Sequence, residues 1–313
     1  MNLYKSIFDI KAEFYLILMT IIWGGTFIFI KLSVETLHPS FFLSIRFGLA
    51  LVGSLIIWRR SLTKIPLDSL GMGIMVGVIM FLGYASQTLG LEYTSATKSG
   101  FITGAYVIFT PILEAIWNRK FPSNKLFIAV IFVMFGLFLI SFGSGSIFDL
   151  NFSEPMNIGD LITLAGALFF ALYIILIDKT TKIYNERGLY FGQLSTAFLL
   201  SGIYFCIQSL LMGAFLFPKS WEGIAIFGLV YTGIIATIIP LLIQTRYQKA
   251  VTPTRAGIIF SLEPVFASLF AFLVAGESLS FIGWLGCLFV LVGILISEIP
   301  FPKMKNQANN SVT

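Results

Sequence analysis

Long apolar stretches alternate with short polar ones along the whole chain. Ten of the apolar stretches cover residues 14–37, 40–58, 69–92, 98–117, 124–142, 158–178, 189–212, 222–243, 254–275 and 280–299. A helix of about 20 mostly apolar residues crosses a hydrocarbon core about 30 Å thick. The pattern therefore predicts an all-α integral membrane protein with ten transmembrane helices.

The composition agrees with this interpretation. Hydrophobic residues make up 57% of the 313 and charged residues 11%, against roughly 25% charged in a soluble domain. The first apolar stretch is longer than the roughly 7–15 apolar residues of a signal peptide, so we expect it to be retained as a span. Cys206 and Cys287 lie inside apolar stretches, where cysteine behaves as a small hydrophobe. We expect neither a metal site nor a cofactor.

Lysine and arginine are distributed unequally between the two sides of the predicted bundle. One side holds 16 of the 20, namely Lys5, Lys11, Arg59, Arg60, Lys64, Arg119, Lys120, Lys125, Lys179, Lys182, Arg187, Arg246, Lys249, Arg255, Lys303 and Lys305. The opposite loops hold Lys98 and Lys219, and Lys31 lies near that end of the first span. Because cytoplasmic loops carry the excess of positive charge, we expect a multi-pass protein of the cytoplasmic membrane with both termini in the cytoplasm. The basic surplus thus reflects orientation and predicts no nucleic-acid partner.

The two halves of the chain contain related segments. "YTSATKSGFITGAYVIFTPIL" and "YQKAVTPTRAGIIFSLEPVFA" share a tyrosine, a Thr-Lys-Ser-Gly or Thr-Arg-Ala-Gly run and a proline, with three extra residues in the first copy. A looser match places Trp23 on Phe170 and Arg46 on Gln193. We therefore predict one five-helix repeat at 1–142 and a second at 158–299, joined by an extracytoplasmic linker at 143–157 and followed by a disordered cytoplasmic tail at 300–313. Because five is odd, the second copy is inverted, as is typical of transporters.

Four segments carry a resemblance to a known family. They are "WGGTFIFIK", "HPSFFLSIRF", "LGLEYTSATKSGFITGAYVIFTPIL" and "TPTRAGIIFSLEPVFASLFAFLVAGESLS". On these segments the chain resembles the EamA-type permeases of the drug/metabolite transporter superfamily. The resemblance implies secondary transport of small metabolites, commonly outward, through a cavity lined by spans 1–4 and 6–9, with spans 5 and 10 peripheral. Two features depart from equal halves: Gly276-Glu277 has no counterpart after span 4, and Gln193 stands where the first half has Arg46.

Arg46 is a charge inside the second span. Such a charge costs about 2.5–3.5 kcal/mol at a helix centre. It shares a helix face with Ala50, Gly53 and Ser54, so we expect it to face protein or a cavity rather than lipid. Two interpretations stay open: a fork that recognises a substrate carboxylate or phosphate, and a structural ion pair or backbone clamp.

Glu263 precedes Pro264 near the middle of span 9. A carboxylate at that depth either pairs with a cation or takes up a proton. We interpret Glu263 as a coupling residue or as the partner of a substrate ammonium group. The alternative is a structural carboxylate bonded to a neighbouring helix, with Arg46 as one candidate partner.

Span 4 combines small, polar and helix-breaking residues. Gly100, Thr103, Thr110 and Glu114 share one helix face, and Pro111 frees a backbone carbonyl. We interpret this face as a cavity wall and Glu114 as a second coupling candidate. The alternative is ordinary helix packing with Glu114 solvated at the interface.

The remaining candidates are assigned by residue type and helix face. The predicted cavity residues are Trp23, Thr26, Arg46, Tyr84, Gln87, Thr103, Tyr106, Thr110, Gln193 and Glu263, and the predicted helix kinks are Pro111, Pro240 and Pro264.

These features lead to one functional prediction and two alternatives. The chain has no G-x-x-x-x-G-K-[ST] nucleotide motif and its single histidine, His38, stands alone. We expect a secondary transporter that exports small organic metabolites or drug-like compounds by alternating access. Its predicted partners are a small-molecule substrate, the lipid bilayer and a proton or counter-substrate, with a homodimer left open. The alternatives are a membrane-embedded enzyme and a channel or sensor.

Overall fold

The computed structural model describes residues 2–59, 65–142, 157–218, 221–275 and 280–298. In chain order the elements are α1 (Asn2–Val34), α2 (Pro39–Trp58), α3 (Leu67–Tyr93), α4 (Ala96–Thr103), α5 (Tyr106–Asn118), α6 (Asn124–Phe142), α7 (Ile158–Thr180), α8 (Glu186–Leu211), α9 (Gly223–Val230), the π-helix η2 (Tyr231–Ile238), α10 (Ile239–Tyr247), the 3-10 helix η3 (Gln248–Ala250), α11 (Pro253–Phe260), α12 (Glu263–Ala275) and α13 (Phe281–Glu298). The predicted linker apart from Asn157, the predicted tail at 300–313, and Gly276-Glu277 lie outside the described residues.

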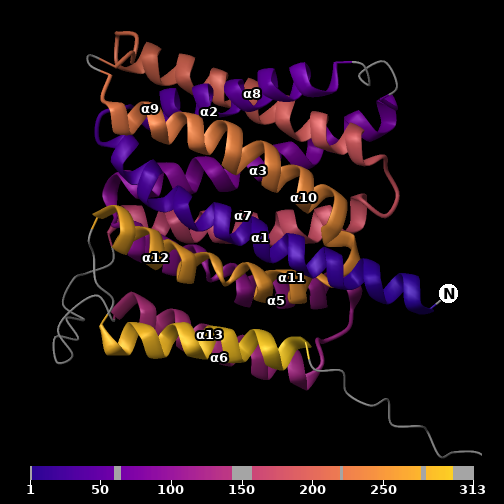
Figure 1. Ribbon diagram of the computed structural model, residues 1–313. Helices are drawn as coiled ribbons and strands as arrows, with labels where there is room; N and C mark the ends of the chain where they lie inside the picture. Colours follow the sequence, from indigo (N-terminus) through magenta and orange to yellow (C-terminus); the bar gives the residue numbers. More distant parts are fainter. Residues whose placement is uncertain (1, 60–64, 143–156, 219–220, 276–279, 299–313) are drawn as a thin grey trace, which may run out of the picture.

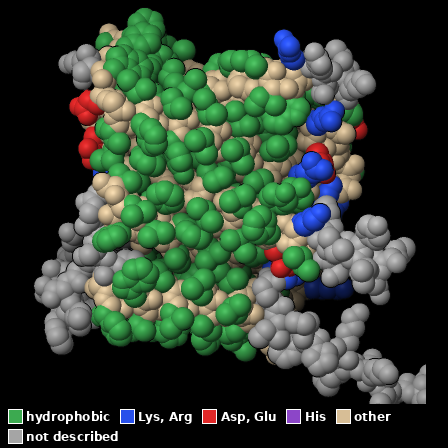
Figure 2. All heavy atoms as spheres, in the orientation of Figure 1, with side chains coloured by type: hydrophobic (Ala, Val, Ile, Leu, Met, Phe, Trp, Pro, Cys, Tyr) green, Lys and Arg blue, Asp and Glu red, His purple; other side chains and the backbone are tan. Residues whose placement is uncertain are grey.

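The all-α membrane class is confirmed. Eight segments of the described chain are long and apolar enough to cross a bilayer, counting α4–α5, α9–η3 and α11–α12 as one segment each. The apolar parts of α6 and α13 are shorter, so ten spans stay a prediction. The helices lie side by side and alternate in direction (Figure 1). Between the two ends of the bundle, the face in Figure 2 is almost entirely apolar, as a lipid-facing surface requires.

Two of the membrane-crossing segments are broken in the middle. α4 ends at Thr103 and α5 begins at Tyr106, while α11 ends at Phe260 and α12 begins at Glu263. The break in the first segment lies before Pro111, and α5 continues through that proline. Pro264 lies directly after the second break, and Pro240 lies near the start of α10, where the π-helix ends.

The broken segments begin with matching caps. The side chain of Ser95 accepts a hydrogen bond from the backbone N–H of Lys98 at the start of α4, and Thr252 does the same for Arg255 at the start of α11. Each cap satisfies a backbone donor that the helix itself leaves free. The caps and the breaks fall 157 positions apart, which aligns residues 87–106 with 244–263 without a gap. This register differs from the gapped alignment expected above.

Helices from the two halves of the chain pack against each other. α1 contacts α9, α10 and α12, and α7 contacts α3, α4 and α5. α6 and α13 pack together at one edge of the bundle (Figure 1). That position agrees with the peripheral fifth and tenth spans that the family resemblance implies.

Glycines bring α6 and α13 into close contact. A Cβ atom at Gly136 would lie 2.6 Å from the carbonyl oxygen of Gly286, and a Cβ at Gly286 would lie 2.6 Å from that of Gly136. Small residues let membrane helices approach in this way. The contact is reciprocal, since each glycine packs against the backbone of the other.

Replacement of Gly136 by alanine is expected to lower the thermal unfolding temperature of the purified protein. The added methyl group overpacks the α6–α13 contact, which typically costs about 1–3 kcal/mol. Gly202→Ala is the matched control, because a Cβ there meets nothing within 4 Å. Equal unfolding temperatures for the two variants would contradict this account of the contact.

Candidate functional site

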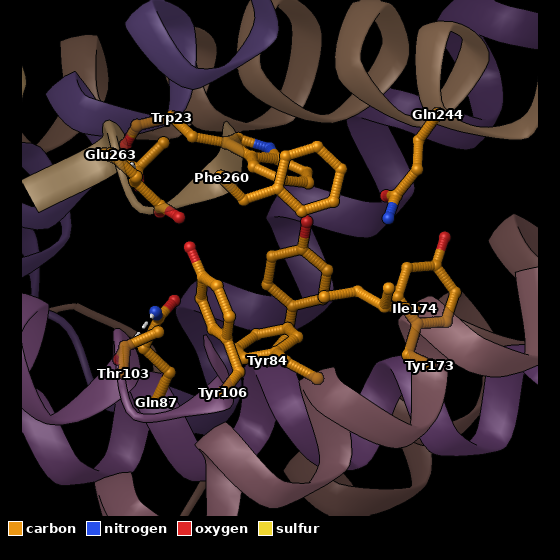
Figure 3. Close-up of a pocket in the computed structure, with 12 residues that line it drawn as sticks. Trp23, Tyr84, Gln87, Thr103, Tyr106, Tyr173, Ile174, Gln244, Phe260 and Glu263 are labelled. Carbon is orange, nitrogen blue, oxygen red and sulfur yellow. Dashed lines mark hydrogen bonds between the residues drawn. The ribbon is translucent and has the colours of Figure 1, made fainter. Parts of the chain in front are cut away.

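A small cavity lies inside the bundle. Its lining residues are Trp23, Thr26, Tyr84, Gln87, Thr103, Tyr106, Phe170, Tyr173, Ile174, Gln244, Phe260 and Glu263 (Figure 3). Each half of the chain supplies six of the twelve. Ligand sites commonly have mostly apolar walls with a few polar groups, and the lining of this cavity has that composition.

Seven of the ten predicted cavity residues line this cavity. They are Trp23, Thr26, Tyr84, Gln87, Thr103, Tyr106 and Glu263. The other three, Arg46, Thr110 and Gln193, lie behind the wall. Five lining residues were not predicted: Phe170, Tyr173, Ile174, Gln244 and Phe260.

The internal repeat relates most of the lining residues in pairs. In the ungapped register Gln87 corresponds to Gln244, Thr103 to Phe260 and Tyr106 to Glu263. The looser match of α1 with α7 pairs Trp23 with Phe170 and Thr26 with Tyr173. Four of the five residues that were missed are therefore repeat partners of predicted ones, and the repeat was the signal that could have found them.

The two helix breaks deliver side chains to the cavity. Thr103 and Tyr106 flank the first break, and Phe260 and Glu263 flank the second. Irregular backbone at membrane depth is tolerated where it is buried in protein or lines a cavity. The two breaks thus lie at the cavity wall, where the backbone groups that they leave unpaired are surrounded by protein and not by lipid.

Six of the twelve lining residues are aromatic. The ring of Trp23 meets Phe260 edge-on at 5.8 Å between centroids, and Tyr84 meets Phe170 at 5.3 Å. The indole N–H of Trp23 donates to the carbonyl oxygen of Ala236 at 3.2 Å. These contacts hold the rings in place on both sides of the cavity.

Glu263 supplies a carboxylate to this wall. Its side chain is 7% exposed and belongs to the first residue of α12. Within the described chain, no hydrogen bond or ion pair reaches the carboxylate. The hydroxyl of Tyr106 points toward it (Figure 3) and is buried without a hydrogen-bond partner among the described residues. The carboxylate therefore has no direct partner among the described residues, although the positive charge of Arg46 is close enough to attract it.

Arg46 lies one layer behind the wall. Its Nε donates to Thr237 Oγ1 at 3.0 Å, and its guanidinium carbon lies 4.6 Å from the centre of the Tyr84 ring. The side chain is 1% exposed, and its two terminal nitrogens have no hydrogen-bond partner among the described residues. Arg46 therefore supports Tyr84 and forms no ion pair with Glu263. This geometry favours the structural interpretation of Arg46.

The other two predicted residues behind the wall also hold lining residues. The hydroxyl of Tyr173 donates to Gln193 Oε1 at 2.7 Å. Thr110 donates to the backbone carbonyl of Tyr106 at 2.7 Å. Both side chains position the wall without reaching the cavity.

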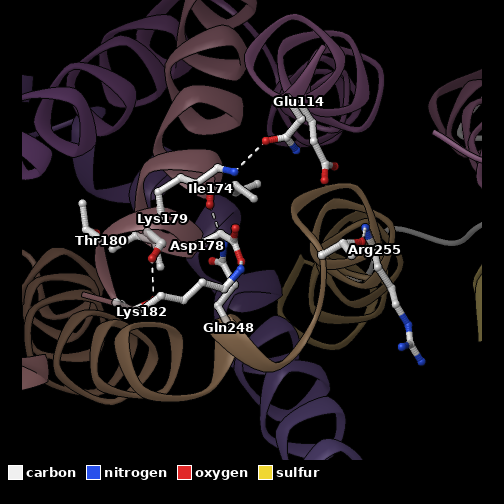
Figure 4. Close-up of polar contacts among 12 residues, drawn as sticks. Glu114, Ile174, Asp178, Lys179, Thr180, Lys182, Gln248 and Arg255 are labelled. Carbon is white, nitrogen blue, oxygen red and sulfur yellow. Dashed lines mark hydrogen bonds and ion pairs between the residues drawn. The ribbon is translucent and has the colours of Figure 1, made fainter. Parts of the chain in front are cut away.

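Glu114 lies at the end of the bundle, as in the second of its two interpretations, and not on the cavity wall. Its carboxylate accepts hydrogen bonds from the backbone N–H and the hydroxyl of Thr254, at 2.9 and 2.5 Å. It thus caps the first turn of α11, where a negative charge is favourable. Glu114 lies among the polar contacts at the end of the bundle (Figure 4) and does not line the cavity.

Comparison with known proteins identifies the family. The sequence profile described as "EamA-like transporter family" matches twice, at residues 10–142 and 157–298. The chain belongs to the EamA-like transporter family.

Individual relatives agree with this assignment. Two proteins of Archaeoglobus fulgidus, each named "Uncharacterized transporter", are 30% identical over 289 residues (92% of this chain, 86% of the relative) and 27% identical over 292 residues (92% and 97%). "Uncharacterized transporter YyaM" of Bacillus subtilis is 25% identical over 302 residues (94% and 96%). A solved crystal structure with 14% identity matches with a TM-score of 0.69 over 92% of this chain and 96% of that one, which shows a shared fold.

Ion pairs join the two halves of this EamA-like chain at both ends of the bundle. At one end Lys98 Nζ lies 2.7 Å from Asp160 Oδ2, and at the other Arg255 Nη2 lies 2.6 Å from Glu13 Oε1. The repeat relates these pairs: Lys98 corresponds to Arg255, and Glu13 to Asp160. Thr94 adds a hydrogen bond of 2.8 Å to Asp160. An equivalent ion pair thus joins the two halves at each end of the bundle.

We predict that Arg46→Lys lowers the free energy of unfolding by about 1.5–3 kcal/mol, because lysine loses the charge-assisted bond to Thr237 and the planar contact with Tyr84. Thermal unfolding in detergent measures the change. Arg187→Lys, at an exposed position, is the control and should leave the midpoint unchanged. If instead Arg46→Lys unfolds like the wild type, the buried guanidinium does not support the wall.

Proposed function

We propose that this chain is a secondary transporter that carries small organic metabolites across the cytoplasmic membrane by alternating access. The observation that carries the proposal is the cavity between the two halves, lined by repeat-related residues and holding the carboxylate of Glu263. Membership of the EamA-like transporter family and the transporter names of the relatives support it.

An inverted repeat at 1–142 and 158–299 is part of the proposal. α1 and α7 begin at opposite ends of the bundle (Figure 1), and the reciprocal packing of α1 and α7 against the other half follows the same symmetry. In transporters built this way, the substrate site lies at the repeat interface beside broken helices. The breaks at 104–105 and 261–262 occupy that position.

The two repeat-related ion pairs are suited to act as gates. A chain with two inverted halves reaches its second state by exchanging the conformations of those halves. To open the cavity on one side, the Lys98–Asp160 ion pair must separate while the Arg255–Glu13 ion pair stays formed. To open it on the other side, the Arg255–Glu13 pair must separate while the Lys98–Asp160 pair stays formed. Both pairs are formed in this structure, and in the proposed cycle each of them breaks in turn.

The distribution of charge supports an orientation. Basic side chains gather at the end of the bundle where the N-terminus lies (Figures 1 and 2). Since positive charge marks the cytoplasmic side, we place the N-terminus in the cytoplasm and the Lys98–Asp160 pair toward the outside. The outward direction of transport rests on the family resemblance.

Transport by purified protein in proteoliposomes tests the proposal. The liposomes are loaded with a mixture of cellular metabolites, and efflux is followed compound by compound. Saturable efflux that is accelerated by the same compound on the opposite side supports a carrier. Flux that rises linearly with concentration indicates a channel, chemical turnover of lipid or metabolite indicates an enzyme, and either result overturns the proposal.

We predict that Lys98→Glu reduces saturable flux at least tenfold, because two carboxylates would then face each other at the outer gate. The double variant Lys98→Glu/Asp160→Lys restores the attraction and should recover most of the flux. The control is Lys182→Glu, since the 2.6 Å pair of Lys182 with Asp178 joins residues only four positions apart (Figure 4). If the double variant is as inactive as Lys98→Glu, the Lys98–Asp160 pair does not act as a gate.

A further inference from the structure

The cavity wall is rich in aromatic rings and carries charge at a single residue. Its six rings belong to Trp23, Tyr84, Tyr106, Phe170, Tyr173 and Phe260. Among the twelve lining residues Glu263 alone has a charged side chain, and none is basic. The faces of aromatic rings are electronegative, so rings and a carboxylate together attract a cation.

One of these rings already holds a cation on the side away from the cavity. The guanidinium of Arg46 lies 4.6 Å from the centre of the Tyr84 ring. Arg46 does not line the cavity, so its charge neither fills the space beside Glu263 nor hydrogen-bonds to it. The carboxylate is left facing the cavity with no cation in contact among the described residues.

The same geometry disfavours anionic and zwitterionic substrates. The terminal nitrogens of Arg46 lack hydrogen-bond partners and would suit a carboxylate, but they lie behind Tyr84, outside the lining. A substrate carboxylate in the cavity would therefore find no basic side chain in the wall and would lie near the carboxylate of Glu263. The side chains of Gln87 and Gln244 are neutral and can form hydrogen bonds with a bound cation.

We infer that the cavity binds a small organic ammonium ion, with its charge at Glu263 and its apolar body between the aromatic rings. This inference rests on the transport function proposed above and specifies its substrate class. The ammonium group takes the place of the cation that the buried carboxylate lacks, and binding desolvates both partners together.

Four probes of similar size test the charge that the cavity accepts. They are 2-phenylethylammonium (cation), 2-phenylethanol (neutral), 3-phenylpropionate (anion) and phenylalanine (zwitterion), titrated calorimetrically into the purified full-length protein in detergent, with empty micelles as blank. We expect the cation to bind at least tenfold more tightly than each of the others. Failure of the cation to bind, or tighter binding of the anion or the zwitterion, overturns the inference.

A pair of variants tests the role of Glu263. Glu263→Gln keeps the shape of the side chain and should remove the preference for the cation over 2-phenylethanol. Glu222→Gln makes the same chemical change at an exposed position and should keep the full preference. Persistence of the preference in Glu263→Gln overturns the inference. If gel filtration shows that Glu263→Gln does not fold, the binding of the four probes to the wild-type protein decides whether the cavity prefers a cation.

The outcome separates this inference from the proposed function. Saturable efflux of a metabolite without an ammonium charge, found in the proteoliposome experiment, would refute the substrate class and leave the transporter standing. If no compound shows saturable efflux but the ammonium probe binds, the transport function is refuted and the ammonium-binding site is retained.

Discussion

Lipid solvates neither a charge nor an unpaired backbone group, and the structure depends on this constraint. Arg46 and Glu263 are buried inside the bundle, turned away from the apolar surface and toward the seam between the halves. The two helix breaks lie at the same seam. A bundle that must hide such groups from hydrocarbon concentrates them in one place, and that place becomes polar enough to recognise a ligand.

The proposed internal repeat accounts for the arrangement of side chains between the two halves. Equivalent segments supply equivalent parts: a capped helix start at Ser95 or Thr252, then a break, then a side chain in the cavity, which is Tyr106 in one half and Glu263 in the other. The architecture is therefore nearly symmetric while the chemistry is not. The asymmetry gives the cavity a single carboxylate facing a tyrosine hydroxyl (Figure 3), where a strictly symmetric pair would have been two acids or two phenols.

The hydrophobic pattern and the residue types were sufficient to predict the membrane class and most of the cavity residues that were proposed from the sequence. Apolar stretches of about 20 residues are rare outside transmembrane helices, so these stretches predicted a membrane protein directly. Glu263 was found because a carboxylate inside a span is costly. Phe170 and Phe260 were missed because each is one of 33 phenylalanines, most of which pack or face lipid. Arg46 was expected in the cavity, since helix periodicity gives the direction of a side chain but not the ring of Tyr84 that stands in front of it.

Accessibility of the cavity from the two sides of the membrane tests the central claim most directly. A cysteine is placed at Thr26 in a protein whose Cys206 and Cys287 are replaced by serine, and a membrane-impermeant thiol reagent is applied separately to right-side-out and inside-out vesicles. A cavity at the seam of two inverted halves that open in turn predicts labelling from each side, and a cross-link across the Lys98–Asp160 position should abolish labelling from the outside only. Labelling from one side alone in the uncross-linked protein, or from neither, would contradict the account.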